Sequence, residues 1–255
     1  MSDRLPLLRD GTFDASIWGS VHHDYPMLPP SFAPEEIVLD VGCHTGALCD
    51  LAARRGATVV GYEANFENYA LAQINLAARG SVTLHHAAIW RSDVGEKTRL
   101  VFTPSADSAN TGGGSVLFPS GPHHWAARPS EGYEPGPPGA ALSAHVVDAV
   151  ALDDVLRELG RVRFLKIDVE GAEFPILLTA RRLDLVDAID GEYHQFTDAE
   201  MALLPSSSRV GDERYSADLL RRRLTAAGFD VALVPDSHGR GFFSATRFTT
   251  TVAPG

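Results

Sequence analysis

Three carboxylates fall within six residues of one short stretch, 164-FLKIDVEGAEFPIL-177. Asp168, Glu170 and Glu173 follow an apolar run that is typical of a buried strand. Carboxylates at the end of a buried strand are costly unless they are hydrogen-bonded, ion-paired or used by a ligand. The pattern therefore indicates a site whose acids hold protons, hydroxyl groups or backbone amides.

The spacing of these acids separates their expected roles. Alternation along an extended strand places Lys166 and Asp168 on one face, with Glu170 near the same side. Gly171 then turns the chain into a helix, and Glu173 falls in its first turn, where a carboxylate favours the helix dipole and accepts from free amides. We predict a structural role for Glu173, a ligand contact for Asp168 and a place in the site for Glu170. Lys166 is expected to pair with a neighbouring acid.

The segments that must position these acids alternate between strands and helices. This alternation predicts βαβ units and a mainly parallel sheet, hence an α/β fold. Without a repeat or a second core, we predict a single domain over residues 1–255. The expected strands are 37–41, 58–63, 82–89, 146–150, 163–168, 186–194, 230–234 and 242–248, and the expected helices are 47–55, 68–78, 151–159, one begun near Pro175, and 216–227.

Two further segments are expected to lie near the site. Residues 103–145 form a Gly/Pro-rich insertion that is too apolar and aromatic for a simple linker. We predict a lid or an acceptor-pocket insertion, with a partly disordered surface loop as the alternative. Residues 1–34 form an N-terminal segment that could cover the site. Histidines that could close over the site from these segments are His22, His23, His123 and His124.

The turn after the first strand, 40-DVGCHTG-46, indicates a nucleotide cofactor. Asp40 would repel a pyrophosphate, but it tolerates a zwitterionic methionine tail beside a sulfonium. Gly42 and Gly46 would let the backbone pass close to that tail. Glu63 ends the next strand, where an acid accepts hydrogen bonds from both ribose hydroxyls. These features favour S-adenosylmethionine over NAD, because the G-x-G-x-x-G spacing of a dinucleotide site is missing.

The remaining cofactor contacts are expected next to these positions. Asn65 and Phe66 would flank the ribose and the adenine, and Ala87, Ala88 and Ile89 leave small or apolar surface for the adenine ring. The predicted cofactor-binding residues are Asp40, Gly42, Cys43, His44, Gly46, Glu63, Ala64, Asn65, Ala88 and, at the reacting end, Asp168.

The segment 164-FLKIDVEGAE-173 resembles the K-I-D-V-E-G-A-E signature of the FkbM family of S-adenosylmethionine-dependent methyltransferases. This resemblance implies a Rossmann-like class I methyltransferase fold with a seven-stranded sheet, and methylation of a hydroxyl on a small molecule such as a polyketide or a sugar. Cys43 and His44 depart from the family's more usual small residue and Asn. Further similar segments are 38-VLDVGCHTG-46, 62-YEAN-65, 152-LDDVL-156 and 190-DGEYH-194.

An unactivated alcohol must lose its proton, and histidine is the usual base near neutral pH. Of the ten histidines, His194 is best placed, because it lies two residues after Glu192 at the end of a strand. The predicted catalytic residues are Asp168, Glu170, Glu192 and His194. A carboxylate and imidazole set of this kind also suits a divalent metal ion. No compact ligand motif supports that alternative, and we predict no metal site.

Composition limits the partners. The formal net charge of −11 disfavours a nucleic acid substrate. No apolar run approaches the length of a membrane span, and the first residues lack the apolar core of a signal peptide, so we expect a cytoplasmic protein without a membrane partner. Cys43 and Cys49 form neither a zinc motif nor a disulfide framework and are expected to be buried small side chains. The oligomeric state stays open.

Our interpretation is a methyltransferase that acts on an oxygen of a small-molecule acceptor. Three alternatives remain at this point. Nitrogen could replace oxygen as the nucleophile. A non-catalytic nucleotide-binding protein could keep the fold, but it would have no use for the acid cluster. An NAD-dependent oxidoreductase is disfavoured by Asp40 and by the glycine spacing.

Overall fold

The computed structural model describes residues 5–94, 98–105, 107–117, 144–236 and 239–248. Most of the insertion predicted over 103–145 therefore lies outside the described residues. The same holds for two of its side chains that the sequence singled out, His123 and His124.

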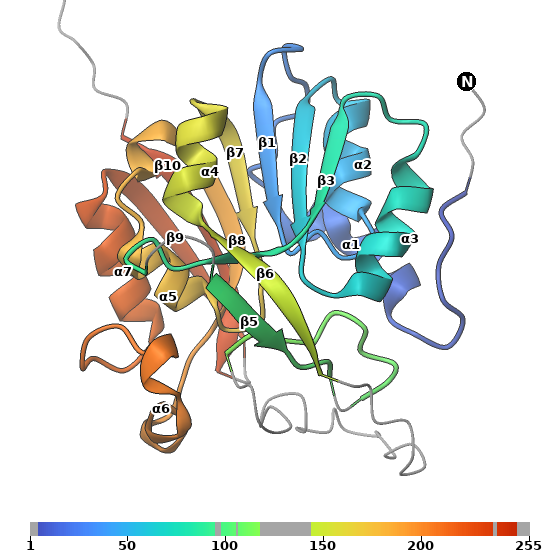
Figure 1. Cartoon of the computed structure of the whole chain (residues 1–255). Coiled ribbons are helices and arrows are strands. Elements are labelled where there is room, and N and C mark those ends of the chain that lie inside the picture. The colour runs from blue at the N-terminus through green and yellow to red at the C-terminus, as the bar shows by residue number, and fades with distance from the viewer. Residues whose placement is uncertain (1–4, 95–97, 106, 118–143, 237–238, 249–255) are drawn as a thin grey trace, which may run out of the picture.

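The main sheet confirms the predicted α/β fold with seven mostly parallel strands (Figure 1). Five neighbouring strands run parallel, and the sixth strand in sheet order is antiparallel to both of its neighbours. In sheet order the strands are β3 (Val82–His86), β2 (Thr58–Glu63), β1 (Ile37–Val41), β7 (Val162–Ile167), β8 (Ala188–His194), β10 (Arg240–Arg247) and β9 (Phe229–Pro235).

Helices cover both faces of this sheet, because neighbouring residues of a strand point to opposite faces and both faces are apolar. In β1, Val38 packs into one buried cluster and Leu39 into the other. The first cluster contains side chains of α1 (Asp14–Asp24), α2 (Ala47–Arg54) and α3 (Phe66–Leu76); the second contains those of α4 (Leu152–Leu159), α5 (Glu173–Thr179) and α7 (Ala217–Ala226). Shorter elements are α6 (Asp198–Leu203), η1 (Leu183–Leu185) and η2 (Ser206–Ser208).

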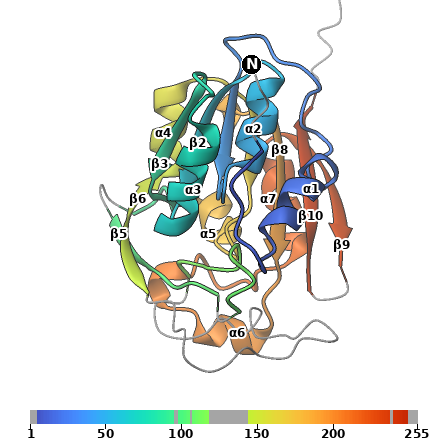
Figure 2. The ribbon, with the colours of Figure 1, turned by 90° about the vertical axis from the view of Figure 1, so that its right-hand side faces the viewer.

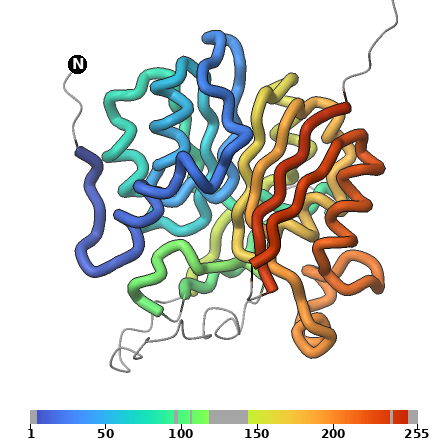
Figure 3. The backbone as a smooth tube through the Cα atoms, turned by 180° about the vertical axis from the view of Figure 1, so that it is seen from behind, coloured from blue at the N-terminus to red at the C-terminus, as the bar shows by residue number. Residues whose placement is uncertain are grey.

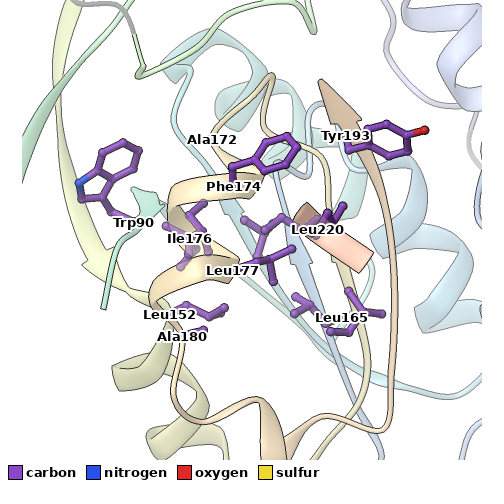
Figure 4. Packing of buried hydrophobic residues seen from close by; sticks show 14 of the residues in the cluster. Trp90, Leu152, Leu165, Ala172, Phe174, Ile176, Leu177, Ala180, Tyr193 and Leu220 are labelled. Carbon is purple, nitrogen blue, oxygen red and sulfur yellow. The ribbon is translucent and has the colours of Figure 1, made fainter. Parts of the chain in front are cut away.

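The second cluster fixes the helix that follows the acid-rich stretch. Figure 4 shows Phe174, Ile176 and Leu177 of α5 packed among side chains of the sheet and of α7. All three are fully buried. Since α5 is only seven residues long, its stability must come from this packing rather than from helix propensity.

A second, three-stranded sheet corrects the prediction of one strand over 82–89. The chain leaves the main sheet after β3, and β4 (Ala88–Trp90) pairs in parallel with β6 (His145–Ala151), which also pairs with β5 (Thr98–Phe102). Figure 2 shows β5 and β6 at the side of the main sheet. The predicted strand over 82–89 combined two patterns of burial. Exposure alternates along β3, whereas β4 is buried throughout. β5 was not predicted.

The carboxyl ends of β1, β2, β7 and β8 meet at one edge of the sheet, since these strands are parallel neighbours. The N-terminal segment with α1 crosses the sheet near this edge (Figure 3). Ligands of open α/β sheets bind at such an edge. None of the described helices has the length and apolar character needed to cross a membrane.

Candidate active site

A cavity of about 380 Å³ lies at the carboxyl ends of the central strands. Its wall comes from the turn after β1 and from the ends of β2, β7 and β8. Further parts of the wall come from α1 with Tyr25, from α2 and α3, from residues 87–89, from β5, from residues 110–116 and from β10. The volume is in the range of small-molecule and cofactor sites. The acids predicted from the sequence therefore share one enclosed space with residues from distant parts of the chain.

Glu63 ends β2 with its carboxylate fixed at the cavity wall. Its Oε2 accepts a hydrogen bond from the backbone N–H of His44 and its Oε1 accepts one from that of Asn65, each at 2.8 Å. Burial raises the pKa of Glu63, although the two backbone donors oppose this effect. Each oxygen keeps a second acceptor position. This carboxylate therefore suits the paired hydroxyls of a ribose.

Asp40 lies on the cavity floor and is fully buried. Its Oδ1 is 3.4 Å from Lys166 Nζ, and its Oδ2 accepts from the Cys49 thiol at 3.2 Å. Lys166 also donates to the carbonyl of Gly42 at 2.5 Å. Burial alone would lower the pKa of Lys166, but Asp40 and Asp168 hold it above its usual value. The expected pairing of Lys166 with an acid is thus confirmed, with Asp40 as the partner.

The two glycines of the turn are required by contacts within the protein. Both have positive φ, +79° at Gly42 and +95° at Gly46. A Cβ on Gly42 would lie 2.0 Å from the carbonyl oxygen of Asp168, and one on Gly46 would lie 2.7 Å from Leu76 Cδ1. Gly42 lines the cavity and Gly46 does not. Packing against the protein, rather than room for a cofactor tail, explains Gly46. Cys43 and Cys49 are both buried and free, as expected.

The predicted adenine wall is partly corrected. Ala64, Ala87, Ala88 and Ile89 line the cavity, and Phe102 and Val116 complete this apolar part. Asn65 lies outside the wall because it caps α3, with its side chain accepting from the backbone of Glu67.

Two further side chains of this region lie differently from the prediction. Phe66, expected beside the adenine, is 59% exposed. Asn68, two residues and about half a turn further along α3, lines the cavity instead. The sequence singled out neither Asn68 nor Phe102. Phe102 belongs to the unpredicted β5, so no expected strand placed it near the site.

His44 connects three segments, α1, the turn after β1 and residues 110–116, through a chain of hydrogen bonds. This chain runs from Trp18 through Thr45, His44 and Thr111 to Asp14. The indole of Trp18 can only donate, and it donates to Thr45 Oγ1 at 2.9 Å. The hydroxyl of Thr45 then donates to His44 Nδ1 at 3.3 Å, His44 Nε2 donates to Thr111 at 2.9 Å, and Thr111 donates to Asp14 at 2.6 Å. Burial lowers the pKa of His44 to about 4, which keeps the imidazole neutral as this order requires.

The acids of the opening stretch and of β8 form the other end of the cavity. The Asp168 side chain is 25% exposed, accepts from the hydroxyl of Tyr25 at 3.0 Å and lies 4.0 Å from Lys166 Nζ. Glu192 Oε1 is 3.7 Å from Arg240 Nε. Burial, helped by the charge of Asp168, raises the pKa of Glu192 to about 8. A carboxylate with such a pKa can accept a proton near neutral pH.

His194 lies behind this wall, which corrects its predicted role as general base. Its Nε2 is 3.3 Å from Glu170 Oε2 and its Nδ1 is 3.6 Å from Glu173 Oε2. Burial would lower the pKa of His194, but these two carboxylates hold it well above 6.5. His194 is 3% exposed and does not line the cavity, so it does not face an acceptor there. Glu170 lines the cavity, and Glu173 accepts from the backbone N–H of Val169 at 2.7 Å, in line with the structural role expected for it.

Replacing His194 with glutamine is expected to lower the free energy of unfolding by about 3 kcal/mol, because it leaves two buried carboxylates without their cation. A raised histidine pKa stabilises the fold below the unfolded value of 6.5, and this contribution is lost as pH rises through the folded value. The loss should therefore shrink at alkaline pH. Urea titrations at several pH values measure it, with the exposed His23→Gln variant as control. Equal stability of the two variants at pH 6 would contradict the ion-pair role.

The described residues provide no set of ligands for the divalent metal ion that the sequence left as an alternative. Among the residues that the structure describes, no three His, Cys, Asp or Glu side chains gather in a group that could hold a metal ion. Asp168, Glu192 and His194 do share one region, but the imidazole nitrogens face Glu170 and Glu173.

The cavity fits S-adenosylmethionine in three respects. The carboxylate of Glu63 suits the ribose hydroxyls, and the small and apolar side chains around Ala88 suit the adenine. The methionine part carries a sulfonium and an ammonium, and the anionic Asp40 and Asp168 stand near that end of the cavity. The chemistry of the wall therefore matches the ribose, the adenine and the two cationic groups of this cofactor.

Comparison with curated proteins finds short matches to methyltransferases. The ubiquinone biosynthesis O-methyltransferases of Brucella ovis and Brucella abortus are 41% identical to the chain over 66 residues, which is 25% of this chain. The chain spans about a quarter (26%) of the length of these relatives.

Solved structures with a similar course of the chain have low sequence identity. A precorrin-6y C5,15-methyltransferase from Geobacter metallireducens has a TM-score of 0.46 at 9% identity, with 96% of this chain and 95% of that chain covered. An rRNA methylase from Streptococcus thermophilus has a TM-score of 0.46 at 10% identity, with 89% and 95% covered. The N-terminal domain of EvdMO1, solved with S-adenosylhomocysteine bound, has a TM-score of 0.45 at 14% identity, with 94% and 82% covered.

The family comparison covers most of the chain. Residues 40–231 match the family described as the methyltransferase FkbM domain. The match begins at Asp40, the first acid of the cavity, and includes Glu63, the acid-rich stretch and the end of β8. The resemblance inferred from the sequence is thereby confirmed: the chain belongs to the FkbM methyltransferase family.

Proposed function

We propose that this chain is an S-adenosylmethionine-dependent methyltransferase that acts on an oxygen of a small molecule, a hydroxyl of a natural product or a sugar. The observation that carries the proposal is the pair of carboxylates at the acceptor end of the cavity, Asp168 and Glu192. Glu192 has a pKa raised to about 8, as a base for a hydroxyl proton requires. Asp168 is held by Tyr25 and Lys166, so it can orient the acceptor without changing place.

The chemistry divides between cofactor and protein. When bound, S-adenosylmethionine supplies a methyl group on a positively charged sulfur: a bond from the methyl carbon to the acceptor oxygen replaces the methyl–sulfur bond, and neutral S-adenosylhomocysteine leaves. In this proposal the hydroxyl proton passes to the carboxylate of Glu192. Asp168 accepts a hydrogen bond from a second hydroxyl of the acceptor and so orients the molecule, while α1 and residues 110–116 keep water out. Positioning of two substrates in this way supplies a large part of the acceleration.

The charge of the protein supports a small acceptor rather than a nucleic acid. The formal net charge is −11. The acceptor end of the cavity adds the carboxylates of Asp168, Glu170 and Glu192, and the cations beside them in the described cavity wall are Lys166 and Arg240. The phosphates of a nucleic acid would be repelled both by the net charge of the protein and by the carboxylates of the cavity. Neutral polyhydroxylated molecules and cations fit this surface better.

Calorimetry with S-adenosylhomocysteine and with NAD is the first test. Binding of the former, and no binding of the latter, is the expected result. Methyl transfer from isotopically labelled S-adenosylmethionine to a panel of glycosides, phenols and hydroxylated macrolides then seeks the acceptor, with mass spectrometry of each product. Binding of NAD without binding of S-adenosylhomocysteine would overturn the proposal.

A nitrogen acceptor is the second candidate, favoured by the carboxylates of Asp168 and Glu192, which would attract a protonated amine. The same panel separates the two candidates if amino sugars are included. The ¹³C chemical shift of a labelled methyl group differs between an ether and an amine. Labelled amines without labelled ethers would replace the oxygen proposal.

A further inference from the structure

Tyr25 reaches the reacting end of the cavity from outside the segment that matches the family. That match begins at residue 40, whereas Tyr25 directly follows α1. Its side chain is 8% exposed and lines the cavity. Its ring packs edge-on against Phe242 of β10, with 6.5 Å between ring centroids. Two segments outside the family match, one on each side of it, therefore meet at the acceptor end.

The hydroxyl of Tyr25 holds the carboxylate of Asp168. It donates to Asp168 Oδ2 at 3.0 Å, and Lys166 Nζ lies 4.0 Å from the same oxygen and 5.7 Å from the centroid of the Tyr25 ring. Burial and the charge of Asp168 keep the pKa of Tyr25 well above 10, so the phenol stays a donor. The backbone N–H of Asp168 donates to Val41 at 3.2 Å. Backbone and side chain of Asp168 are thus both fixed.

The position of Tyr25 is itself fixed by the chain that follows it. The backbone N–H of Met27 donates to Asp190 Oδ2 at 2.9 Å. Arg55 donates to the carbonyls of Leu28 and Pro29, each at 3.0 Å. Met27 is 40% exposed, so its side chain adds little. These backbone hydrogen bonds, together with the buried Leu28, anchor the phenol as a rigid donor.

We propose that Tyr25 is a positioning residue that aims the Asp168 carboxylate at the place where the methyl group is transferred. This rests on the proposed function, because it assumes that the methyl donor binds with its sulfur near Asp168. Tyr25 acts through Asp168 and not on the methyl group itself. A carboxylate that is hydrogen-bonded on one oxygen leaves the other free to meet a hydroxyl or a cation.

Two cofactor analogues test this placement without an acceptor. Sinefungin carries a protonated amine where the cofactor has its sulfonium and methyl group, and S-adenosylhomocysteine is uncharged there. An aimed carboxylate should make sinefungin bind about tenfold more tightly than S-adenosylhomocysteine, since opposite charges a few ångströms apart attract even at protein-surface screening. Calorimetry of both ligands gives this preference. We expect Asp168→Asn to abolish this preference and Tyr25→Phe to reduce it to about threefold or less.

The double variant and a matched tyrosine control make the result specific. Tyr25→Phe combined with Asp168→Asn should behave like Asp168→Asn alone, because one acts through the other. Tyr215→Phe removes another buried hydroxyl, which donates to Ser208 at 2.8 Å outside the cavity, and should keep the full preference for sinefungin.

Three outcomes would overturn the inference. One is a Tyr25→Phe variant that prefers sinefungin over S-adenosylhomocysteine as strongly as the wild type does. The second is independent, multiplicative losses in the double variant. The third is a wild-type protein that binds S-adenosylhomocysteine but shows no preference for sinefungin. Absence of binding by S-adenosylhomocysteine itself would instead refute the proposed function.

Discussion

Replacing Glu63 with alanine is expected to weaken the binding of S-adenosylhomocysteine about 100-fold or more. The carboxylate is fixed by the backbone amides of His44 and Asn65 and offers two further acceptor positions to a ribose. Hydrogen bonds to a charged group contribute about 1.5–3 kcal/mol each, and 1.4 kcal/mol is a factor of ten in affinity. Loss of two such bonds gives the expected effect. Calorimetry measures the dissociation constant directly.

A second variant separates ribose contact from damage to the turn. Glu63→Gln keeps the volume and one carbonyl acceptor, so it should lose less affinity than Glu63→Ala and little stability in a urea titration. Glu67→Ala removes a neighbouring acid whose side chain is 65% exposed, and it should change neither quantity. Wild-type affinity in Glu63→Ala would move the ribose site away from the end of β2.

Replacing Glu192 with glutamine is expected to lower kcat for methyl transfer by about 100-fold or more, the usual contribution of a general base. Only the ionised carboxylate accepts a proton. Because burial and Asp168 raise the pKa of Glu192 to about 8, kcat of the wild type should rise with pH and level off above about 8. Glutamine cannot ionise, so the variant should show no such rise. Labelled methyl transfer to the acceptor found in the panel gives both profiles.

The affinity for S-adenosylhomocysteine should stay nearly unchanged in Glu192→Gln, which separates loss of a base from loss of the cofactor site. Glu213→Gln serves as the control, since this acid is 64% exposed and lies outside the cavity wall. A Glu192→Gln variant with wild-type turnover, or one that keeps the rise of kcat with pH, would assign the proton to another group.

The cofactor half of the site was largely predictable because its signals are local. Asp40 and Glu63 end neighbouring parallel strands, and the alternating elements around them define one sheet edge. Ala88 follows the next strand in the same way. Asn65 shows the limit of this reasoning, since an Asn before a helix is equally a capping residue, and the structure uses it as one.

The acceptor half was predictable only for residues on β7 and β8. Alternation placed Glu192 and His194 on one face of the strand. It could not show that the imidazole of His194 pairs with Glu170 and Glu173. Tyr25 and Phe242 belong to segments whose position over the site depends on tertiary contacts alone. No period or motif in the sequence records which distant segment closes a cavity.

The anchoring of the N-terminal segment has a consequence for how the protein folds. Tyr25 and Asp168 are 143 residues apart in the chain, and Met27 and Asp190 are 163 residues apart. Contacts of such high sequence separation are slow to form, because the loop-closure entropy is lost before the contacts stabilise the structure. The βαβ units of the cofactor half need far shorter loops. We therefore expect the βαβ units that carry Glu63 to form before the acceptor end is complete.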